Sequence, residues 1–500
     1  MAATVLGSAL TYIDATVINI ALPRIGSDLD IGSAGLTWVV NAYALTLAAL
    51  VLLGGSLGDR LGRRAVFTAG VVVFAVASAL CGFAPNEATL IGARAIQGIG
   101  GAMVVPGSLA ILQASFSAGD RARAIGAWSG LTGAAAAVGP FLGGWLVEVA
   151  SWRWVFLINL PVAVLVIVVS RRHVPESRDP DLGDRLDVSG AVLLAGALGA
   201  VTYGLTALSD EGSSAVAALA WLAAGVLLGA TFLVREQRAT DPLLPLDIFR
   251  SRLFTWSNVV TLAVYAALGA LFFSLGLVLQ VGAGFSPLAA GLALLPATVI
   301  MLVFSAQAGA LMARVGPRIP MTLGLALCAL AVGLLDRVDQ QTDYVVDVLA
   351  PTTLLGAGLT LFVGPLTATV LAAAPDAHAG LASGVNNAVA RTAALLSVAA
   401  LPWVSGLGGS GLLDSDRVLD GFSVVVWACV GLLAGGAVMS ALTVTDHGPV
   451  RGADRPTGRG ARWWVTKARP ATRFCSLTTP PVEVPAAPVD EERAPAESTG

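Results

Sequence analysis

Two ionisable side chains stand inside long apolar stretches near the start of the chain. Asp14 lies in "YIDATVINIALP" and Arg94 lies in "RAIQGIGGAM", and neither stretch carries a second charge. Charges in a hydrocarbon layer are costly, so these two are expected to face a water-filled cavity or each other. Desolvation favours a neutral carboxylic acid and a nearby arginine favours its charged form, so an acid held between them can load and release a proton. We predict a proton-coupling and substrate site at Asp14 and Arg94, accompanied by Asn19 and Gln97.

Structural alternatives to this proton chemistry stay open at the level of sequence. Asp14 and Arg94 can form a fixed ion pair that only stabilises the fold. Asp14 can also simply hydrogen-bond Thr16 or Asn19. Ionisable groups inside a membrane are functional by default, so the coupling interpretation is preferred.

The second half of the chain offers a different set of polar side chains. Gln280, Asn387 and Arg391 lie in apolar segments and are candidates for a substrate cavity. Arg391 can equally extend its long side chain to the aqueous edge, and both interpretations stay open. Because no carboxylate lies mid-segment in this half, monovalent, neutral or weakly anionic substrates are favoured over multivalent cations.

The segments that carry these residues are long enough to cross a bilayer. The chain is 56% hydrophobic and only 12% charged, whereas soluble domains carry about a quarter charged residues. A bilayer core needs about 20 apolar residues as helix, and the runs are continuous rather than alternating, which excludes a β-barrel. Fourteen transmembrane helices are predicted, near 3–23, 36–57, 66–84, 88–113, 124–148, 153–171, 187–208, 214–234, 254–281, 287–312, 319–335, 345–371, 384–408 and 421–443.

Arginines are distributed unequally between the two sets of alternate loops. One set holds Arg60, Arg63, Arg64, Arg121, Arg123, Arg171, Arg172, Arg178, Arg185, Arg235, Arg238, Arg250, Arg252, Arg314 and Arg318. The other set holds only Arg24, Arg153, Arg337 and Arg417. Positive loops stay in the cytoplasm, so both termini are predicted to be cytoplasmic. The Ala- and Gly-rich composition with a single lysine, Lys467, indicates a bacterial chain and hence a multi-pass protein of the bacterial inner (cell) membrane.

A short charged turn, "GGSLGDRLGRR", interrupts two apolar runs at residues 54–64. Its glycines permit a sharp turn and close helix approach, and Asp59 can meet a helix N-terminus or a nearby arginine. Such a contact can break when two halves of a transporter rock apart, so we predict a cytoplasmic gate. The motif comprises Gly55, Gly58, Asp59, Arg60, Gly62, Arg63 and Arg64.

The same turn recurs later in the chain. "LGDRLGRRAVFTAG" (57–70) resembles "LMARVGPRIPMTLG" (311–324), with Ala313 where the first copy has Asp59. Six predicted helices precede residue 172 and six follow residue 254, which divides the chain into two similar lobes, 1–172 and 254–443. Two inserted helices at 187–234 separate them. The remaining segment, 447–500, is rich in Pro, Ala and charge and is predicted to be a disordered cytoplasmic tail.

Several stretches together resemble a known family. "GGSLGDRLGRR" resembles the signature turn of the major facilitator superfamily. "YIDATVINIALP" (12–23), "RAIQGIGGAM" (94–103) and "GAAAAVGPFLGGW" (133–145) resemble the first-, fourth- and fifth-helix motifs of its fourteen-helix drug:proton antiporters. "QVGAGFSPLAAGLALLP" (280–296) also resembles a stretch of that group. The resemblance implies an all-α integral membrane protein with the major facilitator fold, two six-helix lobes and two extra helices between them.

The resemblance also carries a function. It implies that the first and fourth helices line a central cavity, and that a bend at Gly139, Pro140, Gly143 and Gly144 biases the protein toward antiport. We expect a proton-coupled exporter of amphipathic small molecules such as drugs or antibiotics, working by alternating access. An importer or symporter of a metabolite on the same fold is the alternative.

Other classes of protein find little support. H-E-x-x-H, G-x-x-x-x-G-K-[ST] and histidine clusters are absent from the sequence, so we expect neither an enzyme nor ATP dependence. We expect no metal and no cofactor, with the proton gradient as the driving force. The expected partners are protons, an amphipathic substrate and the lipid bilayer, without nucleic acid, and the protein is expected to be a monomer. Glu148, close to "SWRW", is expected to be an interfacial charge.

Overall fold

The structure is a computed structural model of the 500-residue chain. It describes residues 1–116, 118–178, 186–209, 212–239, 242–373, 379–406 and 414–444. Within these ranges fourteen helices are long and apolar enough to cross a membrane, which confirms the predicted number, and no β-strand occurs there. Helices suit this environment because each satisfies its own backbone hydrogen bonds in lipid. The predicted tail, 447–500, lies outside the described residues.

Seven helices form the N-terminal lobe. They are α1 (Ala2–Leu29), α2 (Ser33–Leu61), α3 (Arg63–Gly82), α4 (Glu87–Ser115), α5 (Ala118–Val149) and the pair α6 (Trp154–Leu157) and α7 (Asn159–His173), which together make one span. Small residues bring the helices close: a Cβ on Gly54 of α2 would overlap the Ala102 carbonyl of α4. Val72, Val76 and Leu80 form an exposed apolar stripe on α3, at the spacing of one helical face, which suits contact with lipid.

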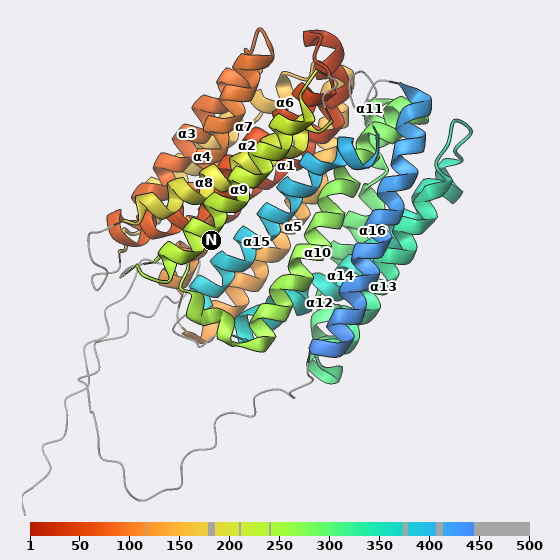
Figure 1. The fold of residues 1–500 in the computed structure, drawn as a ribbon. Helices are drawn as coiled ribbons and strands as arrows, with labels where there is room; N and C mark the ends of the chain where they lie inside the picture. Colours follow the sequence, from red (N-terminus) through yellow and green to blue (C-terminus); the bar gives the residue numbers. More distant parts are fainter. Residues whose placement is uncertain are drawn as a thin grey trace, which may run out of the picture.

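The C-terminal lobe repeats this architecture. Its elements are α10 (Arg252–Leu277) with η2 (Val278–Gly282), α11 (Pro287–Leu292), α12 (Leu295–Val315), α13 (Arg318–Leu334) with η3 (Leu335–Arg337), η4 (Tyr344–Leu349) with α14 (Ala350–Ala372), α15 (Ala379–Val404) and α16 (Ser415–Thr443). Figure 1 shows the red-to-orange N-terminal lobe beside the green-to-blue C-terminal lobe. A short 3-10 helix, η1 (Leu246–Arg250), leads into α10.

Two further helices, α8 (Val188–Ala207) and α9 (Ala215–Glu236), lie between the lobes in sequence and along their junction in space (Figure 1). Leu198 of α8 packs with Ala48 and Ala49 of α2 and with Leu395 of α15. The inserted helix α8 therefore contacts both lobes. α9 packs on α8 and leaves most of its own surface exposed.

The two copies of the repeated turn have the same local shape. Gly62 joins α2 to α3 with φ 116°, and Gly316 precedes α13 at the end of α12 with φ 80°. These backbone angles favour glycine, which explains why both copies keep a glycine there. We call the end of the bundle that holds Arg60–Arg64 the arginine end, and the end that holds Asp28 and Glu148 the far end.

Candidate proton-coupling site

Asp14 and Arg94 meet inside the N-terminal lobe. Arg94 Nη1 lies 2.5 Å from Asp14 Oδ2, and the two residues are 0% and 1% exposed respectively. The second carboxylate oxygen, Oδ1, accepts hydrogen bonds from Gln97 Nε2 at 2.8 Å and from Asn159 Nδ2 at 3.1 Å. Of the two expectations, a water-filled cavity or each other, the structure shows the second, because α1 and α4 bring the two side chains together.

Two further contacts hold the Arg94 side chain, whereas its Nη2 is buried without a hydrogen-bond partner among the described residues. Nε donates to the Val39 carbonyl of α2 at 3.0 Å, and Nη1 also donates to Gln97 Oε1 at 2.7 Å. The guanidinium lies over the Tyr43 ring, 4.4 Å from its centroid, and 5.8 Å from that of Phe156. These rings shield the ion pair and attract the cation.

Two members of this network escaped the sequence analysis. Ser78 Oγ of α3 accepts from Gln97 Nε2 at 2.8 Å and from Asn159 Nδ2 at 3.3 Å, so it ties both amides to one place. Both Ser78 and Asn159 are buried. The available signal was a lone polar residue within an apolar run, as in "FLINLPV" for Asn159. That signal is weak, because hydroxyl and amide side chains are common in membrane helices.

Asn19, predicted beside Asp14, lies apart from this network. Its Oδ1 is buried without a hydrogen-bond partner, and its carbonyl lies at the close approach of α1 to Gly276 of α10. Thr16 is also engaged elsewhere, since its hydroxyl donates to the Ala136 carbonyl of α5 at 2.9 Å. Asp14 therefore takes Arg94, Gln97 and Asn159 as its partners, rather than Thr16 or Asn19.

The predicted polar residues of the C-terminal lobe fall into two places. Gln280 Nε2 donates to the Ile20 carbonyl of α1 at 3.0 Å, and so links the two lobes toward the far end. Arg391 Nε donates to Asn387 Oδ1 at 3.4 Å, and its guanidinium lies 5.0 Å from the centroid of the Tyr12 ring on α1. Arg391 and Asn387 thus lie between the lobes, on a different helix from Gln280.

The acidic side chain of the charged turn, Asp59, forms its ion pair within the turn. Arg63 Nε donates to Asp59 Oδ1 at 2.8 Å, one helical turn away. The N-terminus of α3 is capped by Glu176, whose carboxylate accepts from the Arg64 and Ala65 backbone N–H groups, each at 3.0 Å. Of the two partners expected for Asp59, the structure therefore has the nearby arginine, and a different acid takes the helix N-terminus. Gly55 faces Pro106 of α4, and Gly58 lies near the Arg63 backbone.

The glycines of the α5 motif lie where helices touch. A Cβ on Gly139 would overlap the Thr16 hydroxyl of α1, and one on Gly143 would lie 3.0 Å from the Val17 carbonyl. On the opposite side, a Cβ on Gly144 would overlap the Pro287 carbonyl of α11, and one on Gly291 would overlap the Pro140 carbonyl. This motif therefore joins α5 both to its own lobe and to the other lobe.

An exposed carboxylate completes that junction at the far end. Glu148 Oε2 accepts a hydrogen bond from the backbone N–H of Leu288, in the first turn of α11, at 3.0 Å. Glu148 is exposed, as expected for an interfacial charge, and it also bridges the lobes.

Comparison with known proteins identifies the family of this chain. The family model described as Major Facilitator Superfamily matches residues 4–398. The chain belongs to the major facilitator superfamily. It is 35% identical over 421 residues to the tetracenomycin C resistance and export protein of Streptomyces glaucescens, covering 84% of this chain and 76% of that one. It is 34% identical over 475 residues to a puromycin resistance protein of Streptomyces alboniger, covering 92% and 93%.

Solved structures support the fold of this major facilitator protein. The crystal structure of a D-xylose–proton symporter matches with a TM-score of 0.60 at 15% identity, covering 89% of this chain and 97% of that one. At that identity the likeness concerns the fold alone. The resemblance to drug:proton antiporters that the motifs indicated is confirmed by the resistance and export proteins among the relatives.

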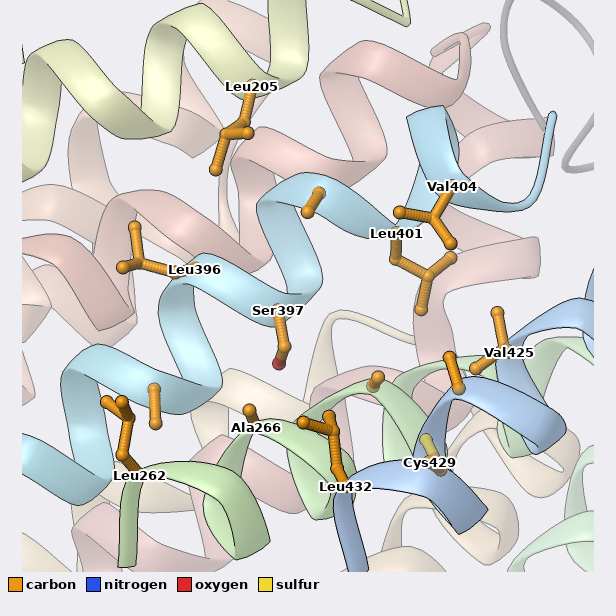
Figure 2. Close-up of a pocket in the computed structure, with 14 residues that line it drawn as sticks. Leu205, Leu262, Ala266, Leu396, Ser397, Leu401, Val404, Val425, Cys429 and Leu432 are labelled. Atoms are coloured by element: carbon orange, nitrogen blue, oxygen red, sulfur yellow. The ribbon is translucent and has the colours of Figure 1, made fainter. Parts of the chain in front are cut away.

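A cavity of about 410 Å³ in this major facilitator chain lies away from the Asp14 network. Figure 2 shows its lining from α10, α15 and α16, with Leu205 of α8 at one side. Apart from the Ser397 hydroxyl and the Cys429 thiol, the lining side chains are apolar. It therefore offers an apolar surface lined by no charged side chain.

Proposed function

We propose that this protein is a proton-coupled antiporter that exports amphipathic small molecules, such as drugs or antibiotics, by alternating access. The observation that carries the proposal is the buried Asp14–Arg94 pair, held by Gln97, Asn159 and Ser78 in a two-lobed transporter fold. Relatives named as antibiotic resistance and export proteins give the direction. The proton gradient drives the cycle, and no cofactor takes part.

The location follows from the distribution of charge. The arginine end faces the cytoplasm of a bacterial cell, because positive loops remain on that side of the inner membrane. Both termini are then cytoplasmic, and the protein acts as a monomer. The far end, where Gln280 and Glu148 bridge the lobes, then faces outward.

The network explains how one proton can alter the structure. As a carboxylate, Asp14 accepts from three donors on two other helices, α4 and α7. Protonation removes the charge that Arg94 neutralises and weakens all three hydrogen bonds, because charge-assisted bonds are the stronger ones. The helices that Asp14 holds together are then released, and the proton leaves again when the site opens to the less acidic cytoplasm. Outward movement of substrate accompanies that inward proton.

The test is a pair of matched substitutions on one helix. Asp14→Asn removes the titratable group with little change of shape, and Asp28→Asn makes the same change at the exposed far end of α1, where Asp28 pairs with Arg153. A toxicity panel in an efflux-deficient host identifies exported compounds. In inverted vesicles, Asp14→Asn should abolish accumulation driven by a pH gradient while Asp28→Asn retains it. Wild-type transport by Asp14→Asn would refute the coupling role.

Direction is measured in the same vesicles. Labelled compound should accumulate inside inverted vesicles and leave right-side-out cells faster when the pH gradient is present. Accumulation in right-side-out cells would establish an importer and overturn the proposal.

A further inference from the structure

Arg391 is a half-buried cation of the C-terminal lobe that forms no ion pair with any residue the structure describes. Its helix, α15, carries no acidic residue in the sequence, and neither do α10, α12 and α14. Of the other buried charged residues among those the structure describes, Asp14 pairs with Arg94, and Asp187 and Glu236 lie beside Arg235. Arg391 therefore stands as an uncompensated positive charge among the described residues, and such a charge is costly where water is scarce.

The position of Arg391 argues against a side chain that only reaches for the aqueous edge. Arg391 lies twelve residues from Ala379, the first residue of α15, which is about 18 Å along the helix at 1.5 Å per residue. Its guanidinium stacks on Tyr12, itself ten residues from the start of α1 at Ala2. That depth is about 15 Å by the same rise, near the middle of a bilayer core of roughly 30 Å.

The guanidinium also keeps hydrogen-bonding capacity. Nε reaches Asn387 Oδ1 at 3.4 Å, a long bond, and Nη2 is buried with no partner. A guanidinium presents its donors as a planar fork that matches a carboxylate, so a free edge of this kind suits an anionic oxygen group. The adjacent Tyr12 ring, contributed by the other lobe, offers an apolar face beside that fork.

We infer that Arg391, Asn387 and Tyr12 form a subsite that binds the anionic oxygen group of an amphipathic organic monoanion, with its aromatic or apolar body packed against Tyr12. The inference rests on the proposed function, since it names the class of compound exported. Binding supplies the counter-charge that Arg391 lacks. Because the subsite draws on α1 and α15, the occupant contacts both lobes, as a transported molecule must.

Three probes with one aromatic body test the charge preference: naphthalene-1-carboxylate, naphthalene-1-carboxamide and 1-naphthylmethylammonium. Binding is measured by titration calorimetry on the purified full-length protein in detergent. Wild type should bind the carboxylate at least tenfold more tightly than the amide, and the ammonium most weakly. Arg391→Gln should lower carboxylate affinity about tenfold to the level of the amide, and leave the amide within twofold. Arg391→Lys should retain part of the preference, because it keeps the charge and loses the fork.

Controls separate recognition from structure. Arg153→Gln removes an exposed arginine at the far end and should leave all three affinities unchanged. Tyr12→Leu should weaken all three probes alike and keep the order. Equal binding of carboxylate and amide by wild type, or an equal loss of all three in Arg391→Gln, would overturn the subsite. If Arg391→Gln does not fold, the wild-type order and Arg391→Lys decide.

This experiment is independent of the coupling test. A carboxylate preference that depends on Arg391, in a protein whose transport ignores the pH gradient, would leave the subsite standing and refute the antiporter. Proton-driven export by wild type without any such preference would support the antiporter and refute the subsite.

Discussion

The two arginines that stack on a tyrosine ring in this protein differ in burial and in their partners: Arg94 is fully buried and Arg391 is half-buried. Arg94 stacks on Tyr43 at 4.4 Å and Arg391 stacks on Tyr12 at 5.0 Å. Arg94 also has a carboxylate, a side-chain amide and a backbone carbonyl within hydrogen-bond distance, whereas Arg391 has one long bond to an amide. Both guanidinium groups keep one buried Nη2 without a partner. The N-terminal lobe nevertheless neutralises its cation with Asp14, whereas Arg391 has no acidic partner in the part of the chain that the structure describes.

The difference indicates a division of labour between the lobes. The Asp14 network stays within the N-terminal lobe, on α1, α3, α4 and α7, so it can change with a proton without any contribution from substrate. The Arg391 contact crosses from α15 to α1, so it changes when the lobes move. The predictions below are ordered by the size of their expected effects.

The largest effect should come from Arg94→Gln, which leaves the buried Asp14 carboxylate without its counter-charge. Breaking a buried ion pair costs about 3–5 kcal/mol, so the midpoint of thermal unfolding in detergent should fall sharply. Arg391→Gln breaks no ion pair and should leave that midpoint unchanged or higher. A double variant, Asp14→Asn with Arg94→Gln, should recover much of the loss. Equal destabilisation by Arg94→Gln and Arg391→Gln would break the comparison.

The next effect concerns Asn159, which the sequence did not single out. Asn159→Ala removes one of three donors to Asp14 and leaves Ser78 with one partner fewer. Hydrogen bonds to charged groups are worth about 1.5–3 kcal/mol, and a thermal melt should show a loss of that order. Asn386→Ala, which removes neutral bonds to Asn258 and Thr261 in the other lobe, should cost less. A larger loss from Asn386→Ala would contradict the view that the charged network is the tighter one.

A third prediction addresses the junction of the lobes. Gly144→Ala places a methyl group against the Pro287 carbonyl, and overpacking of this kind costs about 1–3 kcal/mol. Because it acts on closure at the far end and not on the Asp14 network, transport should fall more than stability. Gly130→Ala on the same helix, where a Cβ meets open space, is the matched control. Normal export by Gly144→Ala, measured in vesicles, would count against closure through this contact.

The smallest effect concerns the ion pair of Asp187 with Arg235 at the aqueous edge. The two side chains lie 2.6 Å apart, and Asp187 also caps α8 by accepting a hydrogen bond from the Gly190 N–H at 2.9 Å. Burial raises the pKa of Asp187, but the Gly190 N–H, the Glu236 carboxyl and Arg235 together hold it below its usual value. The network around Asp187 therefore contributes stability above the ordinary aspartate pKa, and loses it as pH falls through the lowered pKa.

Asp187→Ala should accordingly cost about 1 kcal/mol, the usual value of a helix N-cap. The difference from wild type should shrink as the pH falls below about 4. Thermal melts between about pH 5 and pH 3 measure it. A difference that grows below about pH 4 would contradict the lowered pKa of Asp187.

Much of the architecture followed from local pattern. Apolar runs of about 20 residues predict spans wherever lipid is the solvent, and the repeated turn placed Gly62 and Gly316 at equivalent positions. Asp14 and Arg94 stood out because charges in such runs are rare. Asn159 and Ser78 did not stand out, because amide and hydroxyl groups in a membrane helix are ordinary until their partners are known. Glu176, which takes the α3 N-terminus that Asp59 was a candidate to meet, is a loop charge more than a hundred residues away in sequence, so only the folded chain shows that it lies there.

The sequence by itself determined the fourteen spans, the two-lobed repeat, the family and the two residues at the centre of the N-terminal site, because each depends on composition or spacing along one segment. Only the tertiary structure decided which side chains contact each other. Asn159 hydrogen-bonds to Asp14 and Asn19 does not, and Arg391 lies against Tyr12 with its Nη2 unpartnered. Partner choice between helices depends on rotation, tilt and crossing in three dimensions, and these arise from packing across segments that lie far apart in the chain.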